Sequence, residues 1–511
     1  MVPLAGSAVQ SVDWLAIAPP TVVAVTALVV LVADLFLPAR KKPLLGGISI
    51  AGLTLAGLSL LPLLDGDRST FCLTSGTRAC SYTADHFTLV IQLLVLGGAL
   101  LTALLSVSDL VDFALPSGEF WFLLLSSVAG AALLPASRDL ATLVVALEVA
   151  SLPAFALVGL RRDDSRSSEA ALKFFLSSVT ATAVTLLGVS FVYAATGTLH
   201  LTQVADALTH VDPRLGTLAQ AGVALTLVGF AFKTAAVPFH FWVPDTYVGA
   251  PLPIAAYLSV VGKAVGFTGL ILVTVVAFPS YADVWAPALA VLAALTMTLG
   301  NAGALRQRPD RTRSAVRLLA WSSVGQAGYL LVPIAAAGYA DDPGHAIGST
   351  VAYALMYAAV NLGAFAVAAL VARTHPAHRV ADYRGLYARR PLAALALGFF
   401  LLCLAGLPPG IIGLFAKVTV FHAAVDAGLG WLAVVMAVNV VIALYYYLQW
   451  TALLFRAPES APEAGAEGQE AERPARIPLP LAAATALAAL AGLALSGAPQ
   501  LVLRFASGAL L

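Results

Sequence analysis

The sequence predicts an all-α polytopic membrane protein with fourteen transmembrane helices. Of its 511 residues, 60% are hydrophobic and only 11% are charged, whereas about 25% of the residues in a soluble domain are charged. Apolar runs of about 20 residues recur along the chain, and each is long enough to cross about 30 Å of hydrocarbon. This composition excludes a large soluble core.

Counting the apolar runs gives the positions of the fourteen helices. We expect them at residues 14–37, 44–64, 86–107, 119–136, 138–160, 168–195, 218–240, 252–278, 284–304, 314–336, 346–372, 391–424, 428–455 and 478–503. The twelfth run is too long for one straight span and contains Leu-Pro-Pro-Gly at 407–410. Because proline removes a helical hydrogen bond, we expect this helix to be broken there.

Basic residues divide the loops into two classes and thereby predict the orientation. Nineteen lie in odd-numbered loops, and only Arg68, Arg78, Arg138 and Arg214 lie in even-numbered ones. The positive-inside rule places the odd loops in the cytoplasm and both termini on the outer side of the membrane. An error of one in the helix count would destroy this alternation, so the alternation also supports the count.

Four of the six lysines lie inside predicted spans, where no arginine is used. They are Lys173, Lys233, Lys263 and Lys417. A charge near the bilayer centre costs about 3 kcal/mol or more. Arginine stays protonated in proteins, whereas a lysine in apolar surroundings can lose its proton. The choice of lysine therefore favours proton exchange.

One carboxylate, Glu148, is equally misplaced in the middle of a span. A structural salt bridge or a side chain that snorkels to the interface is the alternative interpretation of each of these five ions. Five such residues in one chain favour a functional interpretation over either alternative.

Prolines are expected to break two of the helices. Pro238 lies in the seventh, and Pro408 and Pro409 lie in the twelfth. Broken helices at corresponding positions of two halves are typical of transport folds, although a lone membrane proline also occurs as a simple kink. The breaks are five helices apart, so we expect two inverted repeats of five helices each, helices 4–8 and 9–13. The two repeats differ in one respect: Lys233 precedes Pro238, whereas Lys417 follows Pro408 and Pro409.

These repeats and one polar stretch define the expected domain organisation. Residues 457–476 are rich in Ala, Glu and Pro and cannot bury a core. The expected parts are the N-terminal helices 1–3 at 1–118, the first repeat at 119–278, the second repeat at 279–456, a cytoplasmic linker at 457–477 and the last helix at 478–511.

Several chemistries have no support in the sequence. The chain has three cysteines but no Cys-x-x-Cys and no Cys/His grouping, so an iron–sulfur or zinc site is not expected. It has no Gly-x-Gly-x-x-Gly or Walker motif for a nucleotide. Nor does it have the basic cluster interleaved with aromatic residues that nucleic acids require.

Two cysteines are expected to form a disulfide. Cys72 and Cys80 lie in the loop between helices 2 and 3, with Gly76 between them to allow a turn. The charge count places this loop outside the membrane, where disulfides form and persist. The alternative is two unpaired residues in an ordinary loop. Cys403, in an apolar span, should stay reduced.

Three stretches of the chain resemble a known family. They are "GFAFKTAAVPFHFWVPDTYVGAPLPIAAYLS" at 229–259, "LEVASLPAFAL" at 147–157 and "CLAGLPPGIIGLFAKVTVF" at 403–421. They are similar to motifs of helices 7–8, 5 and 12 in the antiporter-like subunits of respiratory complex I and of multi-subunit cation/proton antiporters. Two more, "SSEAALKFFLSS" at 167–178 and "YRGLYARRPLAALAL" at 383–397, look most like the branch called subunit N of bacterial NADH–quinone oxidoreductase.

The resemblance implies roles for the misplaced ions. Glu148 matches the family's helix 5 glutamate, and the matching lysines of helices 6, 7, 8 and 12 are Lys173, Lys233, Lys263 and Lys417. These residues are expected to translocate protons. His240 is expected at a channel mouth, although a lone histidine beside Trp242 is also compatible with a structural role. The mild departures from the family pattern at Ala154, Phe155 and Phe174 remove no ionisable residue.

The same resemblance implies partners and a location. The chain is expected in a bacterial cell membrane, in contact with lipid and with other membrane-arm subunits, some of them antiporter-like. It is expected to carry no cofactor, because NADH, flavin, iron–sulfur clusters and quinone would be handled by partner subunits.

Two other functions compete with this expectation. In a cation/proton antiporter, the same lysines would serve sodium exchange, and neighbouring genes would distinguish the two complexes. A non-pumping spacer of the membrane arm is the second, and the retained buried ions argue against it.

Overall fold

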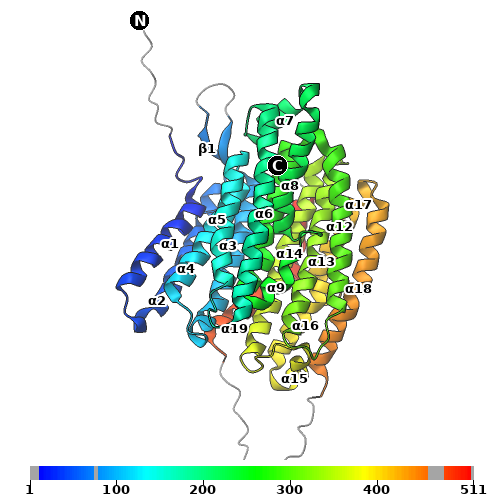
Figure 1. Cartoon of the computed structure of the whole chain (residues 1–511). Helices are drawn as coiled ribbons and strands as arrows, with labels where there is room; N and C mark the ends of the chain where they lie inside the picture. Colours follow the sequence, from blue (N-terminus) through cyan, green and yellow to red (C-terminus); the bar gives the residue numbers. More distant parts are fainter. Residues whose placement is uncertain (1–10, 74–78, 458–476, 508–511) are drawn as a thin grey trace, which may run out of the picture.

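A computed structural model describes residues 11–73, 79–457 and 477–507. It shows a bundle of long helices that run side by side (Figure 1). Among the described residues, thirteen helical spans are long and apolar enough to cross a membrane, and Pro391–Ala405 is a shorter apolar helix. The shorter helix forms half of the predicted twelfth span. The fourteen predicted spans are therefore all present.

The long helices follow the predicted runs closely. They are α1 (Ala18–Phe36), α2 (Pro43–Leu58), α3 (His86–Asp112), α4 (Ser117–Leu133), α5 (Leu140–Val158), α6 (Ser165–Thr196), α8 (Gly216–Thr234), α12 (Ala282–Leu305), α13 (Ser314–Ala337), α14 (Pro343–Ala372), α18 (Gly430–Phe455) and α19 (Leu479–Gly497). The eighth span consists of α10 (Leu252–Tyr257) and α11 (Lys263–Ile271), with π-helical segments at Leu258–Gly262 and Leu272–Ala277. A four-residue helix, α20 (Gln500–Leu503), follows α19.

Short elements at the ends of the bundle were not predicted. Strands β1 (Arg68–Cys72) and β2 (Cys80–Ala84) form an antiparallel hairpin. The hairpin and α7 (Leu201–Leu208) lie at one end of the bundle, and α15 (Leu386–Arg389) lies at the other (Figure 1). Helix α7 buries Leu201, Val204 and Leu208, which share one helical face. These elements are too short to stand out as long apolar runs in the sequence.

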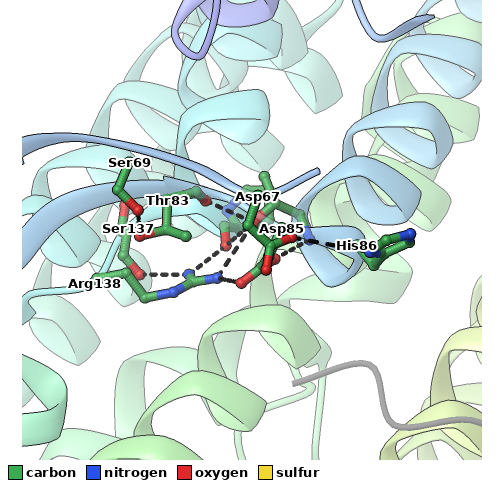
Figure 2. Close-up of polar contacts among 9 residues, drawn as sticks. Asp67, Ser69, Thr83, Asp85, His86, Ser137 and Arg138 are labelled. Carbon is green, nitrogen blue, oxygen red and sulfur yellow. Dashed lines mark hydrogen bonds and ion pairs between the residues drawn. The ribbon is translucent and has the colours of Figure 1, made fainter. Parts of the chain in front are cut away.

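Arg138 connects the base of this hairpin to the helix bundle through hydrogen bonds and an ion pair (Figure 2). Its guanidinium pairs with Asp85, which also caps α3, and donates to the carbonyl oxygens of Pro135 at 2.8 Å and Ser137 at 3.0 Å. Its side chain is only 13% exposed. Among the few basic residues at this end, Arg138 therefore has a structural role between α3, α5 and the hairpin.

Cys72 and Cys80 are cross-strand partners in the hairpin. Their sulfur atoms are 1.97 Å apart in the structure, as in a disulfide, whereas Cys403 is free and buried. The loop between the two cysteines includes residues 74–78, which lie outside the described part of the chain.

Thiol mapping of the purified protein tests this disulfide prediction. We expect one cross-linked peptide that contains Cys72 and Cys80, and a single thiol, Cys403, that reacts only after denaturation. Closing so short a loop should stabilise the hairpin by about 2–3 kcal/mol in the chain-entropy model. Cys72→Ser should therefore loosen the hairpin and leave the helix bundle intact. Three reactive thiols in protein isolated from native membranes would contradict the prediction.

Both predicted breaks are present, and they begin in the same way. Helix α8 ends at Thr234 and is followed by Ala235 at φ +67°, and α16 (Pro391–Ala405) ends before Gly406 at φ +86°. The chain becomes helical again at α9 (Trp242–Gly249) and at α17 (Ile411–Asp426). Left-handed residues are common terminators of helices because they let the next amides bond back to the last carbonyls.

The seventh span is broken as predicted, but its first half ends before Pro238 rather than at residue 240. The helix has already ended at Thr234, and the amides of Ala235 and Ala236 bond back to Phe232 and Ala231 at 3.0 and 2.9 Å. Pro238 lies in the non-helical segment that follows. Pro408 and Pro409 likewise lie in the gap between α16 and α17. All three prolines therefore lie in gaps between two helices and not at kinks in a continuous helix.

The predicted linker at 457–477 lies almost wholly outside the described residues. The partition into domains at 118, 278 and 456 remains a prediction.

Candidate functional site

Three of the four misplaced lysines are buried in the bundle. Lys233 on α8, Lys263 on α11 and Lys417 on α17 are 5%, 1% and 4% exposed. Lysines are almost never fully buried unless another group satisfies them. The surroundings of each lysine therefore decide what it can do.

Aromatic rings surround the amine of Lys233. Its Nζ lies 4.9 Å from the ring centroid of Phe174 and 5.0 Å from that of Phe155. Trp242 stacks on Phe174 at 4.3 Å and donates from Nε1 to the carbonyl of Phe232 at 3.1 Å, at the open end of α8. The ring faces favour the charged amine through cation–π attraction, while their exclusion of water disfavours it.

A cavity of about 20 Å³ borders Lys233. Ser127, Ser151 and Tyr257 line it, and the hydroxyls of Ser127 and Tyr257 are 2.8 Å apart. A cavity with polar walls and this volume can hold a single water molecule. It extends from Lys233 to Gly262, the neighbour of Lys263.

Glu148 lies on α5 and is partly buried. Thr182 on α6 donates to its Oε1 at 2.6 Å. No ion pair within 4.0 Å joins Glu148 to Lys233 among the contacts of the described residues. The predicted pair between them stays a prediction.

Lys263 donates to the backbone carbonyl of Ser323 on α13. Tyr357 on α14 donates to the hydroxyl of the same serine at 2.9 Å. Lys263 directly follows the π-helical segment, in which Ser259 accepts a bond of 2.6 Å from Asn361. Such wide turns often occur at functional sites, because they expose backbone groups that a regular helix would satisfy.

Lys417 binds the open end of the broken twelfth span. Its amine donates to the carbonyls of Leu404 at 2.9 Å and Ala405 at 2.7 Å. These are terminal carbonyls of α16, which have no partner inside the helix, and a cation is favoured there. A Cβ at Gly406 would lie 3.1 Å from the Lys417 side chain. Lys417 thus reaches back across the break, which accounts for its position after the prolines.

Polar side chains of α13 and α18 connect the surroundings of Lys263 to those of Lys417. Gln326 donates to Tyr447 at 3.2 Å and to the Leu404 carbonyl at 3.4 Å, and it accepts from Tyr353. Ser322, the neighbour of Ser323, bonds Tyr447. We call Lys233, Lys263, Lys417 and these side chains the polar route.

Sequence reasoning missed the uncharged members of the polar route. The available signal was "WSSVGQAGY" at 321–329, which places two serines and a glutamine inside an apolar span. Buried uncharged groups of this kind need hydrogen-bond partners, but the partners come from other helices and cannot be read from this stretch alone.

The expectation that Lys173 is a buried ion is wrong. Its side chain is 50% exposed, and it pairs with Glu169 at 2.6 Å and with Asp245 at 2.9 Å. The residue lies about two turns into α6, on a face that carries the acidic neighbour one turn earlier. Lys173 is therefore separate from the polar route.

His240 lies in the gap between α8 and α9, partly buried. Its ring centroid is 5.6 Å from that of Trp321, and its Nδ1 has no hydrogen-bond partner among the described residues. The role at a channel mouth stays a prediction. No group of three or more His, Cys, Asp or Glu that could hold a metal occurs in the described part of the chain.

Buried lysines beside two broken helices, joined by hydrogen-bonding side chains, are typical of membrane proteins that move ions or protons. The family described as "NADH:quinone oxidoreductase/Mrp antiporter, TM" matches residues 137–443. NADH-quinone oxidoreductase subunit N 2 of Streptomyces griseus is 78% identical over 508 residues, which cover 98% of this chain and 95% of that protein. Subunit N of Salinispora tropica is 46% identical, with coverages of 88% and 86%. This chain therefore belongs to the antiporter-like family, within its subunit N branch.

Solved structures agree with this assignment. A chain of respiratory complex I from Thermus thermophilus is 32% identical, with a TM-score of 0.74 and coverages of 96% of this chain and 100% of that chain. A chain of the Mrp complex from a Dietzia species is 23% identical, with a TM-score of 0.80 and 96% coverage of both chains. The second likeness shows a shared fold alone.

Proposed function

We propose that this chain translocates protons across a bacterial cell membrane as a subunit of NADH–quinone oxidoreductase. The polar route is the observation that carries the proposal. It runs from Lys233 through Lys263 to Lys417 in an otherwise apolar core, and its hydroxyl members both donate and accept protons. A structural core would bury these positions with apolar side chains at a lower free-energy cost.

Lys233 is the first group that exchanges a proton in this mechanism. When Glu148 approaches its amine, the carboxylate favours the charged form of the lysine. When the two separate, the apolar surroundings favour the neutral form. Movement of Glu148 thus changes the proton affinity of Lys233 in both directions.

The released proton passes from Lys233 to Lys263 through water in the small cavity. The hydroxyl groups of Tyr357, Ser322 and Tyr447 support its transfer towards Lys417. Lys417 then releases it on the outer side. The gaps at Pro238 and at Pro408–Pro409 give water access to backbone groups at the two ends of this path.

Partner subunits supply the energy in this proposal. We assign NADH, flavin, iron–sulfur clusters and quinone to those partners rather than to this chain. A change of charge or shape at a lateral contact with another membrane-arm subunit would drive the separation of Glu148 and Lys233.

The orientation rests on the distribution of arginine. The arginine-rich odd loops face the cytoplasm by the positive-inside rule. The hairpin and α7 lie in even loops, at the end of the bundle opposite α15 (Figure 1), so we place them on the outer side together with both termini.

Isolation of the native complex tests the function. A complex purified through this chain should contain NADH- and quinone-handling subunits, and its vesicles should acidify upon NADH oxidation in sodium-free medium. Small antiporter subunits and a strict need for sodium would favour the cation/proton antiporter. If the complex still pumps protons after Lys233, Lys263 and Lys417 have all been replaced, the chain is better explained as a non-pumping spacer of the membrane arm.

A double-mutant cycle tests the Glu148–Lys233 pair. Glu148→Gln and Lys233→Ala should each reduce pumping, and the double variant should lose little more than either single one. The reason is that the two residues act as one unit, and such effects are not additive. The measurement is the initial rate of proton translocation per NADH, at equal amounts of assembled complex, for the unmodified protein, the two single variants and the double variant. Strictly additive losses would contradict the pair.

A further inference from the structure

An ion pair outside the polar route connects two elements around Lys233. The amine of Lys173 on α6 lies 2.9 Å from Asp245 on α9. Asp245 also lies 3.9 Å from Arg317 on α13. The carboxylate is thus the point where α6, α9 and α13 meet, and it is 41% exposed.

The residues next to this pair cover Lys233. Phe174 follows Lys173 on α6, and Trp242 precedes Asp245 by three residues on α9, hence on the same helical face. The two rings stack at 4.3 Å with an interplanar angle of 13°, and Phe174 touches the amine of Lys233. The same two helices therefore carry the ion pair and, beside it, the aromatic cover of Lys233.

The C-terminal end of α9 packs backbone against backbone on α6, whereas Trp242 at its N-terminal end is held by ring stacking and one hydrogen bond to Phe232. At its C-terminal end, a Cβ on Gly249 would lie 2.4 Å from the Ala170 Cβ and 2.6 Å from the Arg166 carbonyl, so the backbone of α9 rests directly on α6. Its N-terminal end, which carries Trp242, follows the non-helical segment 235–241. A displacement of α9 about Gly249 would move Trp242 the most.

We propose that Asp245 is a positioning residue that, with Lys173, holds α9 against α6 and keeps Phe174 and Trp242 closed over Lys233. Release of this pair opens Lys233 to water from the cytoplasmic side. The inference rests on the proposed function for its purpose. It assigns Lys173 to this closure and not to the transfer of the proton.

The strength and the surroundings of the pair suit a contact that opens and closes. Half-exposed ion pairs are weak because water competes for both partners. Glu169 already contacts Lys173 at 2.6 Å, and Arg317 lies close to Asp245. Each partner therefore keeps an opposite charge when the pair separates.

The reactivity of a cysteine at the Lys233 position tests the closure directly. In complexes with Lys233→Cys, a hydrophilic thiol reagent is added to the cytoplasmic face, and the rate of labelling is measured. Complexes without this substitution give the background. We expect Asp245→Asn and Lys173→Gln to accelerate labelling about two- to fivefold, the range expected for loss of an exposed pair.

Glu169→Gln is the matched control, because it removes the other partner of Lys173 and leaves Asp245 in place. Its labelling rate should stay unchanged. An unchanged rate in both Asp245→Asn and Lys173→Gln, or an equal acceleration in Glu169→Gln, would overturn the inference. Labelling does not depend on pumping, so a failure of the proposed function leaves this result interpretable. If Asp245→Asn fails to assemble, Lys173→Gln alone decides the outcome.

Discussion

Lys233→Ala is expected to lower NADH-driven proton pumping more than about tenfold, because the removal of a group that carries the proton typically costs at least that much. The assembled complex should persist. Lys233 makes no close ion pair among the described residues, and removing a buried amine relieves a desolvation cost that offsets the lost packing of its stem. Acidification of reconstituted vesicles, normalised to NADH oxidation and to the amount of complex, measures the loss.

Two further variants sharpen this result. Lys233→Arg keeps the positive charge but replaces a releasable proton with one that arginine holds, so it should pump as poorly as Lys233→Ala. Lys42→Ala should pump normally, because Lys42 is a surface lysine paired with Asp34 at 2.9 Å. Full pumping by Lys233→Ala in normally assembled complexes would remove Lys233 from the mechanism.

Gly413→Ala should prevent normal assembly of the second half of the broken twelfth span. A Cβ at this position would lie 1.9 Å from the carbonyl oxygen of Cys403, where α17 starts directly against the backbone of α16. Overpacking of a core typically costs about 1–3 kcal/mol, and a collision with backbone atoms belongs at the upper end of that range or beyond. To avoid it, α17 must move, which separates Lys417 from the Leu404 and Ala405 carbonyls.

The thermal midpoint of the purified complex and its yield measure this effect. Gly47→Ala is the control, because a Cβ there meets no atom within 4 Å, and alanine is the better helix former by about 0.5–1 kcal/mol. We expect an unchanged or slightly raised midpoint for Gly47→Ala, and a low yield with a lowered midpoint for Gly413→Ala. Equal midpoints for the two variants would show that α16 and α17 separate without cost.

The sequence predicted the spans well because the bilayer constrains them so strongly. Each span needs about 20 apolar residues, and this length is visible without any tertiary information. The helix breaks were placed to within a few residues, because proline marks them. The exact end of α8 was missed, since the left-handed turn at Ala235 carries no sequence signal comparable to that of glycine.

The candidate site was predicted only for its charged members. Lys233, Lys263 and Lys417 stand out because a charge is costly inside an apolar span. Ser322, Gln326 and Tyr447 do not stand out, because each is an ordinary residue until a partner from another helix is placed beside it. The expectation for Lys173 failed because position along a helix does not say which face is buried.

By itself, the sequence determined that the chain has fourteen spans, two of them broken, and that Lys233, Lys263 and Lys417 lie inside apolar spans at a cost. These properties follow from hydrophobicity and proline, which act locally along the chain. Only the tertiary structure decided that Lys417 binds the end of α16, that Glu148 accepts a hydrogen bond from Thr182, and that Lys173 pairs with Asp245. Each of these contacts joins residues from different helices, and the helix packing that sets such distances is not encoded in any single segment.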